Sequence, residues 1–133
     1  MTEPAWISER DALAIHARLL RLDGGTPGLR DAGVLASALA RPLQHRERGD
    51  EPDLVRLAAL YTDATIRNHP FVDGNKRVGF VIGVLFLKLH GFAFTAPQPL
   101  ATHAVLYLAA RRTGLDDYER LLRDLVRSPS TDH

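Results

Sequence analysis

Apolar residues recur every three or four positions along most of the chain, which is the spacing of one face of an α-helix. In the first segment with this spacing, the face consists of Ala12, Ile15, His16 and Leu19. Ser8 stands where an N-cap is needed, and Asp11 follows three residues later, as in a capping box. A first helix is therefore predicted, and the glycine- and proline-rich residues 23–28 end it in a loop.

The next two segments are also predicted to be helical. A second, short helix should begin at its cap, Asp31, and should be stopped by Pro42. The polar, highly charged residues 44–52 then predict an exposed loop. A third helix begins at Asp53 and should end before Pro70, because proline disfavours helical geometry in the residue that precedes it.

A fourth helix is predicted over residues 73–90, with Gly91 as its C-terminal stop. This segment is apolar nearly all round, so we expect it at the centre of a helical bundle. The connector over residues 92–99 should be partly extended. A fifth helix carries Pro99 in its first turn, and a sixth follows the break at Gly114.

These elements predict an all-α fold, a single-domain bundle around the central apolar helix. A length of 133 residues is that of one ordinary domain. We expect the domain to occupy residues 1–127 and residues 128–133 to form a disordered tail.

Composition narrows the function classes. The chain has no cysteine, which excludes disulfides, thiol catalysis and thiolate metal sites and fits the reducing cytoplasm, where we expect the protein. A formal net charge of +1 argues against a dedicated binder of nucleic acid or of anionic membranes. The longest apolar run, residues 78–87, is too short to span a bilayer, and the first residues do not resemble a secretion signal.

The chemistry-bearing residues gather between the third and fourth helices. His69 should face a cleft, while Phe71 anchors the loop in the core. The residues that follow form the cap and first turn of the fourth helix, where backbone N–H groups without partners and the positive end of the helix dipole favour an anion such as a phosphate.

The side chains of this segment have matching chemistry. Gly74 leaves room for close approach, and Lys76 and Arg77 add positive charge. Asp73 offers oxygen ligands of the kind that Mg²⁺ takes, and His69 can accept a proton from an attacking hydroxyl. Together they could transfer a phosphorus-containing group from a nucleotide to a hydroxyl. The alternative, which the residues alone leave open, is an ordinary helix end and turn with solvated basic side chains.

Residues 69–77 read His-Pro-Phe-Val-Asp-Gly-Asn-Lys-Arg and meet every fixed position of the pattern His-x-Phe-x-Asp/Glu-Gly-Asn-Gly/Lys-Arg. The stretch resembles the Fic/Doc family and, within it, the Doc (death-on-curing) toxins. Residues 27–31 and 37–42 upstream and 90–92 downstream are also similar to Doc proteins, so the resemblance covers residues 5–126.

The resemblance implies a role for each motif residue. His69 would be the general base, and Asp73 would hold Mg²⁺. ATP would place its phosphates in a pocket lined by four consecutive residues, Gly74, Asn75, Lys76 and Arg77. The last two would also act in catalysis by stabilising the transferred group.

Two positions depart from the pattern of Fic enzymes that transfer AMP. Lys76 replaces the second glycine of Gly-Asn-Gly, and Phe80 stands where those enzymes carry a second arginine. Both departures are Doc-like and imply transfer of the γ-phosphoryl group to a protein hydroxyl, with a threonine of elongation factor Tu as the known Doc target and arrested translation as the outcome. The implied partner is a Phd-type antitoxin, with no direct binding of nucleic acid or membrane. AMP transfer and a non-catalytic binding module on the same scaffold are the alternatives.

Other candidates are weaker. Arg67 could reach a phosphate, but a solvated arginine at a helix end is the simpler interpretation. Residues 44–52 lie where family members present a target-docking flap, and a solvated loop is again simpler. Structural or packing roles are expected for Trp6, His16, Arg30 and Tyr107.

Overall fold

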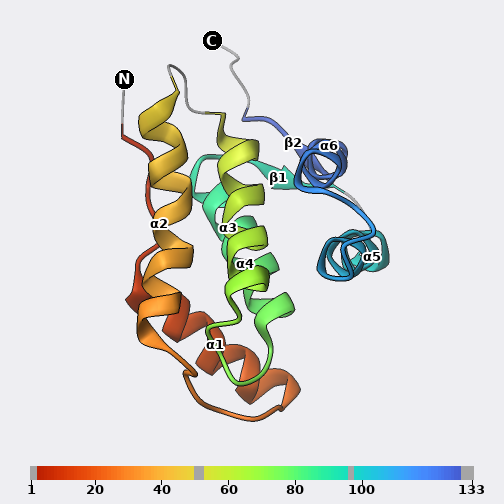
Figure 1. Ribbon diagram of the computed structural model, residues 1–133. Helices are drawn as coiled ribbons and strands as arrows, with labels where there is room; N and C mark the ends of the chain where they lie inside the picture. Colours follow the sequence, from red (N-terminus) through yellow and green to blue (C-terminus); the bar gives the residue numbers. More distant parts are fainter. Residues whose placement is uncertain (1–2, 50–52, 96–97, 130–133) are drawn as a thin grey trace.

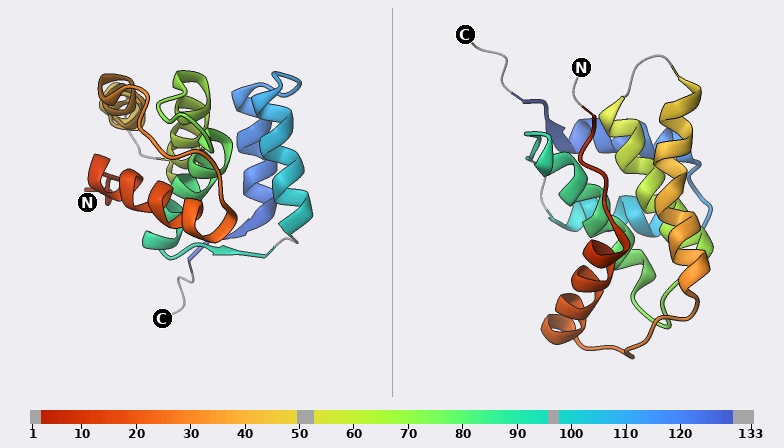
Figure 2. Two further views of the ribbon diagram at one scale, coloured as in Figure 1. Left: turned by 90° about the horizontal axis from the view of Figure 1, so that it is seen from below. Right: turned by 90° about the vertical axis from the view of Figure 1, so that its left-hand side faces the viewer.

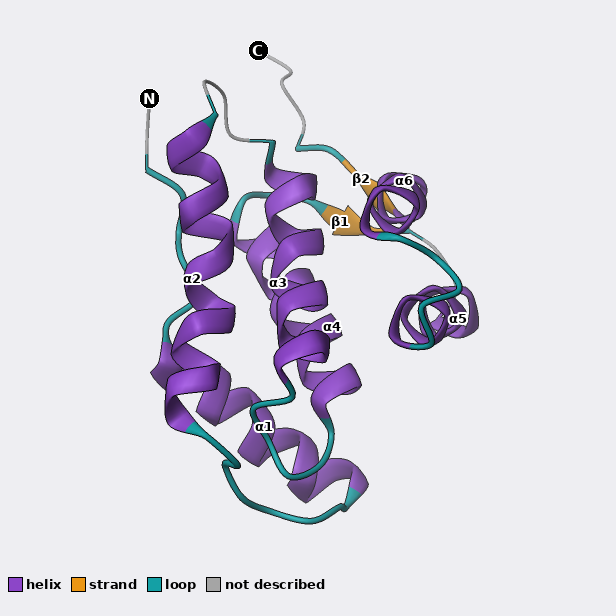
Figure 3. Cartoon of the chain, in the orientation of Figure 1, coloured by secondary structure: helices purple, strands orange, loops and turns teal. Residues whose placement is uncertain are grey.

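The computed structural model describes residues 3–49, 53–95 and 98–129, which form six helices and one small sheet (Figures 1 and 3). The elements in chain order are α1 (Glu9–Asp23), α2 (Ala32–Arg48), α3 (Leu54–Asn68), α4 (Asn75–Leu89), β1 (Ala93–Phe94), α5 (Gln98–Ala109), α6 (Leu115–Leu125) and β2 (Val126–Arg127). The predicted all-α class is confirmed.

The helices begin where the capping residues predict. Ser8 and Asp11 form a full capping box, in which the backbone N–H of each residue donates to the side chain of the other. Asp31 accepts from the N–H of Val34 at the start of α2, and Asp53 caps α3 in the same way. These local bonds satisfy N–H groups that have no partner within the helix.

The bundle runs lengthwise through α2, α3 and α4, and α1 crosses one end of it (Figure 1). In the same view α5 and α6 are seen end-on, beside α3 and α4. The views of Figure 2 show that α1 lies next to the loop between α3 and α4. The predicted reactive segment therefore lies at the end of the bundle that α1 covers.

The centre of the bundle is shared between α4 and α3. Ten of the 15 residues of α3 are buried, from Val55 to Thr65. The buried polar side chains of α3 have hydrogen-bond or ion-pair partners. The Thr62 hydroxyl donates to the Gly79 carbonyl at 2.8 Å, and the buried Asp63 carboxylate pairs with Arg41 and Arg67. Satisfied polar groups can be buried at little net cost, which explains why a less apolar helix occupies the core.

Helix α2 contradicts the prediction that Pro42 stops it, because the helix continues to Arg48. Pro42 is buried together with Leu35, Ala38 and Leu39, at the spacing of a single helical face. Burial of this complete face offsets the backbone hydrogen bond that the proline ring removes.

The charged segment after Pro42 was predicted to be an exposed loop, but most of it belongs to α2. Residues 44–48 are the largely exposed last turn of α2 rather than a loop, and residues 50–52 lie outside the described part of the chain.

The connector after α4 is partly extended, as predicted. Strand β1 pairs antiparallel with β2, with Phe94 opposite Val126, and the N–H of Thr95 donates to the Leu125 carbonyl at 2.9 Å. Pro129 packs beside Gly91. Strand β2 was not predicted, and of the expected tail, residues 130–133 lie outside the described residues. In the described part of the chain, none of the helices combines the length and apolar character needed to cross a membrane.

Candidate functional site

The loop between α3 and α4 is anchored by Phe71. Its ring is fully buried and stacks on the buried imidazole of His16 from α1, with ring centroids 4.1 Å apart. His16 Nε2 also lies 3.0 Å from the backbone carbonyl of Asp73. The core role predicted for Phe71 is confirmed, and His16 joins α1 to both halves of the loop.

A second segment runs alongside the same loop. The N–H of Val72 donates to the Gly28 carbonyl at 3.0 Å, and the N–H of Arg30 donates to the Pro70 carbonyl at 2.7 Å. Leu29 and Phe71 form an antiparallel bridge between these two bonds. The loop is therefore held in place by residues about 40 positions earlier in the chain.

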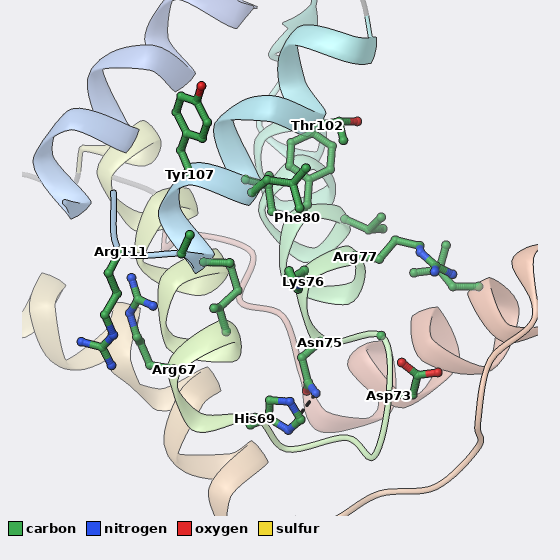
Figure 4. A pocket seen from close by; sticks show the side chains of 18 of the residues that line it. Arg67, His69, Asp73, Asn75, Lys76, Arg77, Phe80, Thr102, Tyr107 and Arg111 are labelled. Carbon is green, nitrogen blue, oxygen red and sulfur yellow. Dashed lines mark hydrogen bonds between the residues drawn. The ribbon is translucent and has the colours of Figure 1, made fainter. Parts of the chain in front are cut away.

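His69 is the C-cap of α3 and takes a left-handed backbone conformation, with φ of 53°. It is exposed to solvent and lines a cavity. Asn75 Nδ2 approaches its Nδ1 to 3.1 Å, as the dashed line in Figure 4 shows. The imidazole thus faces an open cavity, as the sequence predicts.

Asn75 is buried and holds the loop together. Its side-chain oxygen accepts from the Phe71 N–H at 2.9 Å, and its Nδ2 donates to the Phe71 carbonyl at 2.8 Å. These two bonds orient the amide so that Nδ2 points to His69 Nδ1, which acts as the acceptor. Because the amide is fully engaged, Asn75 can offer only its backbone N–H to a phosphate.

The first turn of α4 is open, as an anion site requires. Its N-cap, Gly74, has φ of 84°, a left-handed conformation that favours glycine, and no side chain caps the helix. Within the described residues, the N–H groups of Asn75, Lys76 and Arg77 have no acceptor. The requirement at Gly74 is thus conformational, since a Cβ there would meet only His16 at 3.9 Å.

Asp73 is exposed at the edge of this turn. The pKa of its carboxyl group lies below its ordinary value, mainly because the Thr26 N–H donates to it at 3.0 Å. The Gly74 N–H and the nearby charge of Arg77 lower it further. The group is therefore a carboxylate under ordinary conditions, which is the form that binds a cation.

The two basic side chains of the turn differ in their surroundings. Lys76 is exposed and lines the cavity. Arg77 also lines it and pairs with Asp23 at the end of α1, at 3.3 Å with both side chains about half exposed. An exposed pair of this kind contributes little to stability, so Arg77 can turn to an anionic ligand at small cost.

The cavity has a volume of about 1350 Å³ and brings together residues from α1, α3, the α3–α4 loop, α4, α5 and the segment after α5. Figure 4 shows Lys76 and Arg77 on one side, Arg67 and Arg111 on the other, and His69 below them. All six predicted site residues line the cavity, and Asn75 is the one among them that is buried: the other five are His69, Asp73, Gly74, Lys76 and Arg77.

The α5 wall of the cavity was missed at the sequence level. Tyr107, expected to be a packing residue, is 48% exposed and lines the cavity beside Leu106. The sequence pattern did indicate their exposure, because both residues lie outside the helical face that carries Ala104 and Leu108. Trp6, in contrast, packs on Phe86 as expected.

Arg67 lines the cavity but is not the solvated side chain that the simpler interpretation expected. It donates to the Leu108 carbonyl of α5 at 2.7 Å and pairs with the buried Asp63 at 3.3 Å. Arg41 of α2 completes the group, 2.8 Å from the other Asp63 oxygen. Arg67 therefore joins α5, which forms a wall of the cavity, to α3.

Comparison with known proteins agrees with this geometry. A sequence model described as the Fic/DOC family matches residues 6–87, which contain α1 to α3, the loop and most of α4. The protein named "Protein kinase doc" of Escherichia phage P1 is 36% identical over 94 residues, or 69% of this chain and 74% of that protein. "Toxin Doc" of Mycolicibacterium smegmatis is 38% identical over 74 residues, or 55% of this chain and 57% of that protein. The chain therefore belongs to the Fic/DOC family.

Proposed function

We propose that the protein is a Doc-type toxin kinase, which transfers the γ-phosphoryl group of ATP to a protein hydroxyl. The observation that carries this proposal is the position of the His69 imidazole, exposed in the same cavity as the uncapped first turn of α4 and its two basic side chains. A nucleophile's proton acceptor and a phosphate-binding helix end within one cavity are the two parts that phosphoryl transfer needs. The relative named a protein kinase supports the transfer activity, and the relative named a toxin supports the role as a toxin.

In this reaction the acceptor hydroxyl oxygen bonds to the γ-phosphorus, and the bond from that phosphorus to the β–γ bridging oxygen breaks. ADP leaves with the bonding electrons, and His69 takes the hydroxyl proton. The backbone N–H groups at the start of α4, together with Lys76 and Arg77, stabilise the charge on the transferred group. The protein contributes mainly position and electrostatics.

The role of His69 as proton acceptor depends on which of its ring nitrogens already carries a proton. While Nδ1 accepts from Asn75, the neutral ring carries its proton on Nε2. Acceptance of a proton at Nε2 therefore requires the other tautomer, in which Asn75 no longer donates to Nδ1. We propose that this exchange occurs when the acceptor hydroxyl enters the cavity.

Asp73 is the residue that fits magnesium. Its carboxylate is exposed and kept ionised, and Mg²⁺ is commonly held by one or two carboxylates together with substrate phosphates. Among the described residues, no cluster of three or more potential ligands forms a separate metal site. A bound Mg²⁺ would neutralise charge on the phosphate oxygens.

Phosphoryl transfer is favoured over AMP transfer by Lys76 and Phe80. The Lys76 side chain stands at the first turn of α4, where AMP-transferring relatives have a glycine, and it suits a terminal phosphate, which carries more charge. Phe80 lines the cavity one turn later, where those relatives have an arginine. The proposed acceptor is a threonine of elongation factor Tu in the cytoplasm, so that translation is inhibited, with a Phd-like antitoxin as the neutralising partner.

The test is incubation of the protein with elongation factor Tu, Mg²⁺ and ATP labelled at either the α or the γ position. Label from the γ position should appear on elongation factor Tu, and intact-mass analysis should find that the mass of the factor has increased by one phosphoryl group. His69→Ala should abolish transfer, whereas His103→Ala, at an exposed histidine of α5 outside the cavity lining, should retain it.

Transfer of the α label alone would replace the kinase proposal with AMP transfer. A His69→Ala variant that arrests translation as well as the parent would contradict both and would indicate a binding module. Co-expression with a Phd-like antitoxin should restore growth.

A further inference from the structure

Arg30 reaches the end of α3 from the loop between α1 and α2, although 39 residues separate it from His69. Its Nε donates to the backbone carbonyl of His69 at 2.6 Å, and its terminal nitrogen donates to the carbonyl of Asn68 at 2.9 Å. Its own backbone N–H donates to the carbonyl of Pro70 at 2.7 Å. A single residue thus binds three successive carbonyls centred on His69.

These carbonyls need an external partner. The last carbonyls of a helix have no intrahelical donor, and the helix dipole makes that end negative. His69 also leaves the helix in a left-handed conformation, which a side chain with a Cβ adopts at a cost. The cationic, two-pronged guanidinium satisfies both carbonyls and stabilises this unfavourable turn.

The arrangement differs from that of the other structural arginines. Arg41, Arg56 and Arg123 each pair with a carboxylate. Among the described residues, no carboxylate pairs with Arg30, and the adjacent Asp31 is engaged in capping α2. The whole hydrogen-bonding capacity that the structure assigns to the Arg30 side chain is therefore directed at Asn68 and His69.

We propose that Arg30 is a positioning residue for the transfer reaction, which holds the backbone of His69 so that the imidazole faces the cavity and meets Asn75. This inference rests on the proposed function. Arg30 is not among the residues that line the cavity, and the proposed phosphate-binding groups lie at the other end of the loop, at the start of α4. Its loss should therefore misplace the proton acceptor without weakening nucleotide binding.

Steady-state kinetics of the full chain test this separation. In Arg30→Gln, kcat should fall by about 10- to 100-fold while KM for ATP stays within about twofold, because a small misplacement of a reacting group is costly. Arg30→Lys keeps the charge but lacks the two-pronged guanidinium that binds the carbonyls of Asn68 and His69 together. Its kcat should therefore lie between that of the parent and that of Arg30→Gln. Arg18→Gln, at an exposed arginine of α1, is the matched control and should behave like the parent.

A raised KM for ATP with unchanged kcat would overturn the proposal, as would a loss in Arg30→Gln no larger than in Arg18→Gln. If Arg30→Gln does not fold, as judged by circular dichroism, Arg30→Lys decides between the same outcomes.

A second readout does not depend on activity. The imidazole ¹⁵N and ¹H signals of His69 report whether Nδ1 accepts from Asn75, and in Arg30→Gln they should move toward those of a free histidine, while Arg18→Gln leaves them unchanged. If the parent transfers no phosphoryl group but these signals move, the kinase proposal fails, whereas the orientation of the His69 imidazole by Arg30 is supported. If the parent is an active kinase and neither kcat nor the His69 signals change in Arg30→Gln, the positioning role is wrong.

Discussion

His69 shows at the scale of one residue how the site is built on an unfavourable local conformation. A left-handed residue that is not glycine costs about 1–2 kcal/mol, and the surrounding contacts must offset that cost. Asn75 contacts the ring, and Arg30 contacts the carbonyl. The strain is consistent with a residue kept for chemistry rather than for stability.

Because the backbone is strained at residue 69, a glycine variant should be more stable there than an alanine variant, which is the reverse of the usual order within a helix. His69→Gly should be more stable than His69→Ala by up to about 1 kcal/mol, because glycine adopts the left-handed conformation freely and only part of that gain is lost to the flexibility of the unfolded chain. Urea unfolding of the two variants measures the difference.

Lys76, in the first turn of α4, supplies the control. There the order should be normal, with the glycine variant less stable than the alanine variant by about 1 kcal/mol. Equal stability of His69→Gly and His69→Ala, or a more stable His69→Ala, would contradict the strain at His69.

At the scale of elements, the close approach of α3 and α4 sets the geometry of the site. Two glycines of α4 face α3: a Cβ on Gly79 would lie 3.1 Å from the Thr62 carbonyl oxygen, and a Cβ on Gly83 would lie 3.0 Å from that of Ala58. The side-chain oxygen of Thr62 would be only 2.6 Å from the Gly83 Cβ. The absence of two side chains therefore lets the helix that ends at His69 lie directly against the helix that begins at Asn75.

Gly83→Ala should reduce the free energy of unfolding by about 1–2 kcal/mol. The added methyl group meets the backbone of α3, which cannot move aside, and the cost of overpacking exceeds the gain of about 1 kcal/mol in helix propensity. Gly49→Ala is the control, because a Cβ there would make only an ordinary contact at 3.8 Å with the His45 carbonyl oxygen and the backbone φ of −110° suits alanine; it should leave stability unchanged or raise it by up to about 1 kcal/mol. Chemical denaturation measures both, and a more stable Gly83→Ala would show that α3 and α4 have room to separate.

At the scale of the whole molecule, two buried tyrosines join distant parts of the chain. The Tyr61 hydroxyl of α3 accepts from the Ile7 N–H at 2.9 Å, which ties the N-terminal segment to the bundle. Tyr118 of α6 is also buried and belongs to the hydrophobic core. Burial raises the pKa of each hydroxyl to about 12.

Stability should consequently decrease at alkaline pH. In the unfolded chain a tyrosine ionises near pH 10, so between pH 10 and 12 the unfolded state releases protons that the folded state retains. The stabilisation is complete below pH 10 and is lost as the pH rises through 12, at about 2 kcal/mol for each of Tyr61 and Tyr118. Unfolding free energies measured from pH 9 to 12 should show this decrease.

Single tyrosine variants show how much of the stability lost at alkaline pH each tyrosine accounts for. Tyr118→Phe and Tyr61→Phe should each remove about half of it, although Tyr61→Phe also leaves the Ile7 N–H without its partner and starts from a lower stability. Tyr107→Phe, at an exposed ring, is the control and should keep the full decrease. A loss that persists unchanged in Tyr118→Phe would assign the alkaline decrease to other groups.

The sequence by itself determined the features that depend on neighbouring residues. The helix starts at Ser8, Asp31 and Asp53, the end of α3 before Pro70 and the stop at Gly91 all follow from bonds or clashes within about four residues. The reactive segment was also recognisable, because its chemistry is contained in nine consecutive residues.

Only the tertiary structure decided the features that depend on contacts between distant segments. Pro42 remains within α2 because its face of the helix is buried, and α5 forms a cavity wall because Arg67 binds its last turn. Arg30 meets His69 across 39 residues, a contact that no local pattern encodes. The physical reason is that burial and long-range hydrogen bonds outweigh local preferences of about 1–3 kcal/mol wherever the packed chain supplies them.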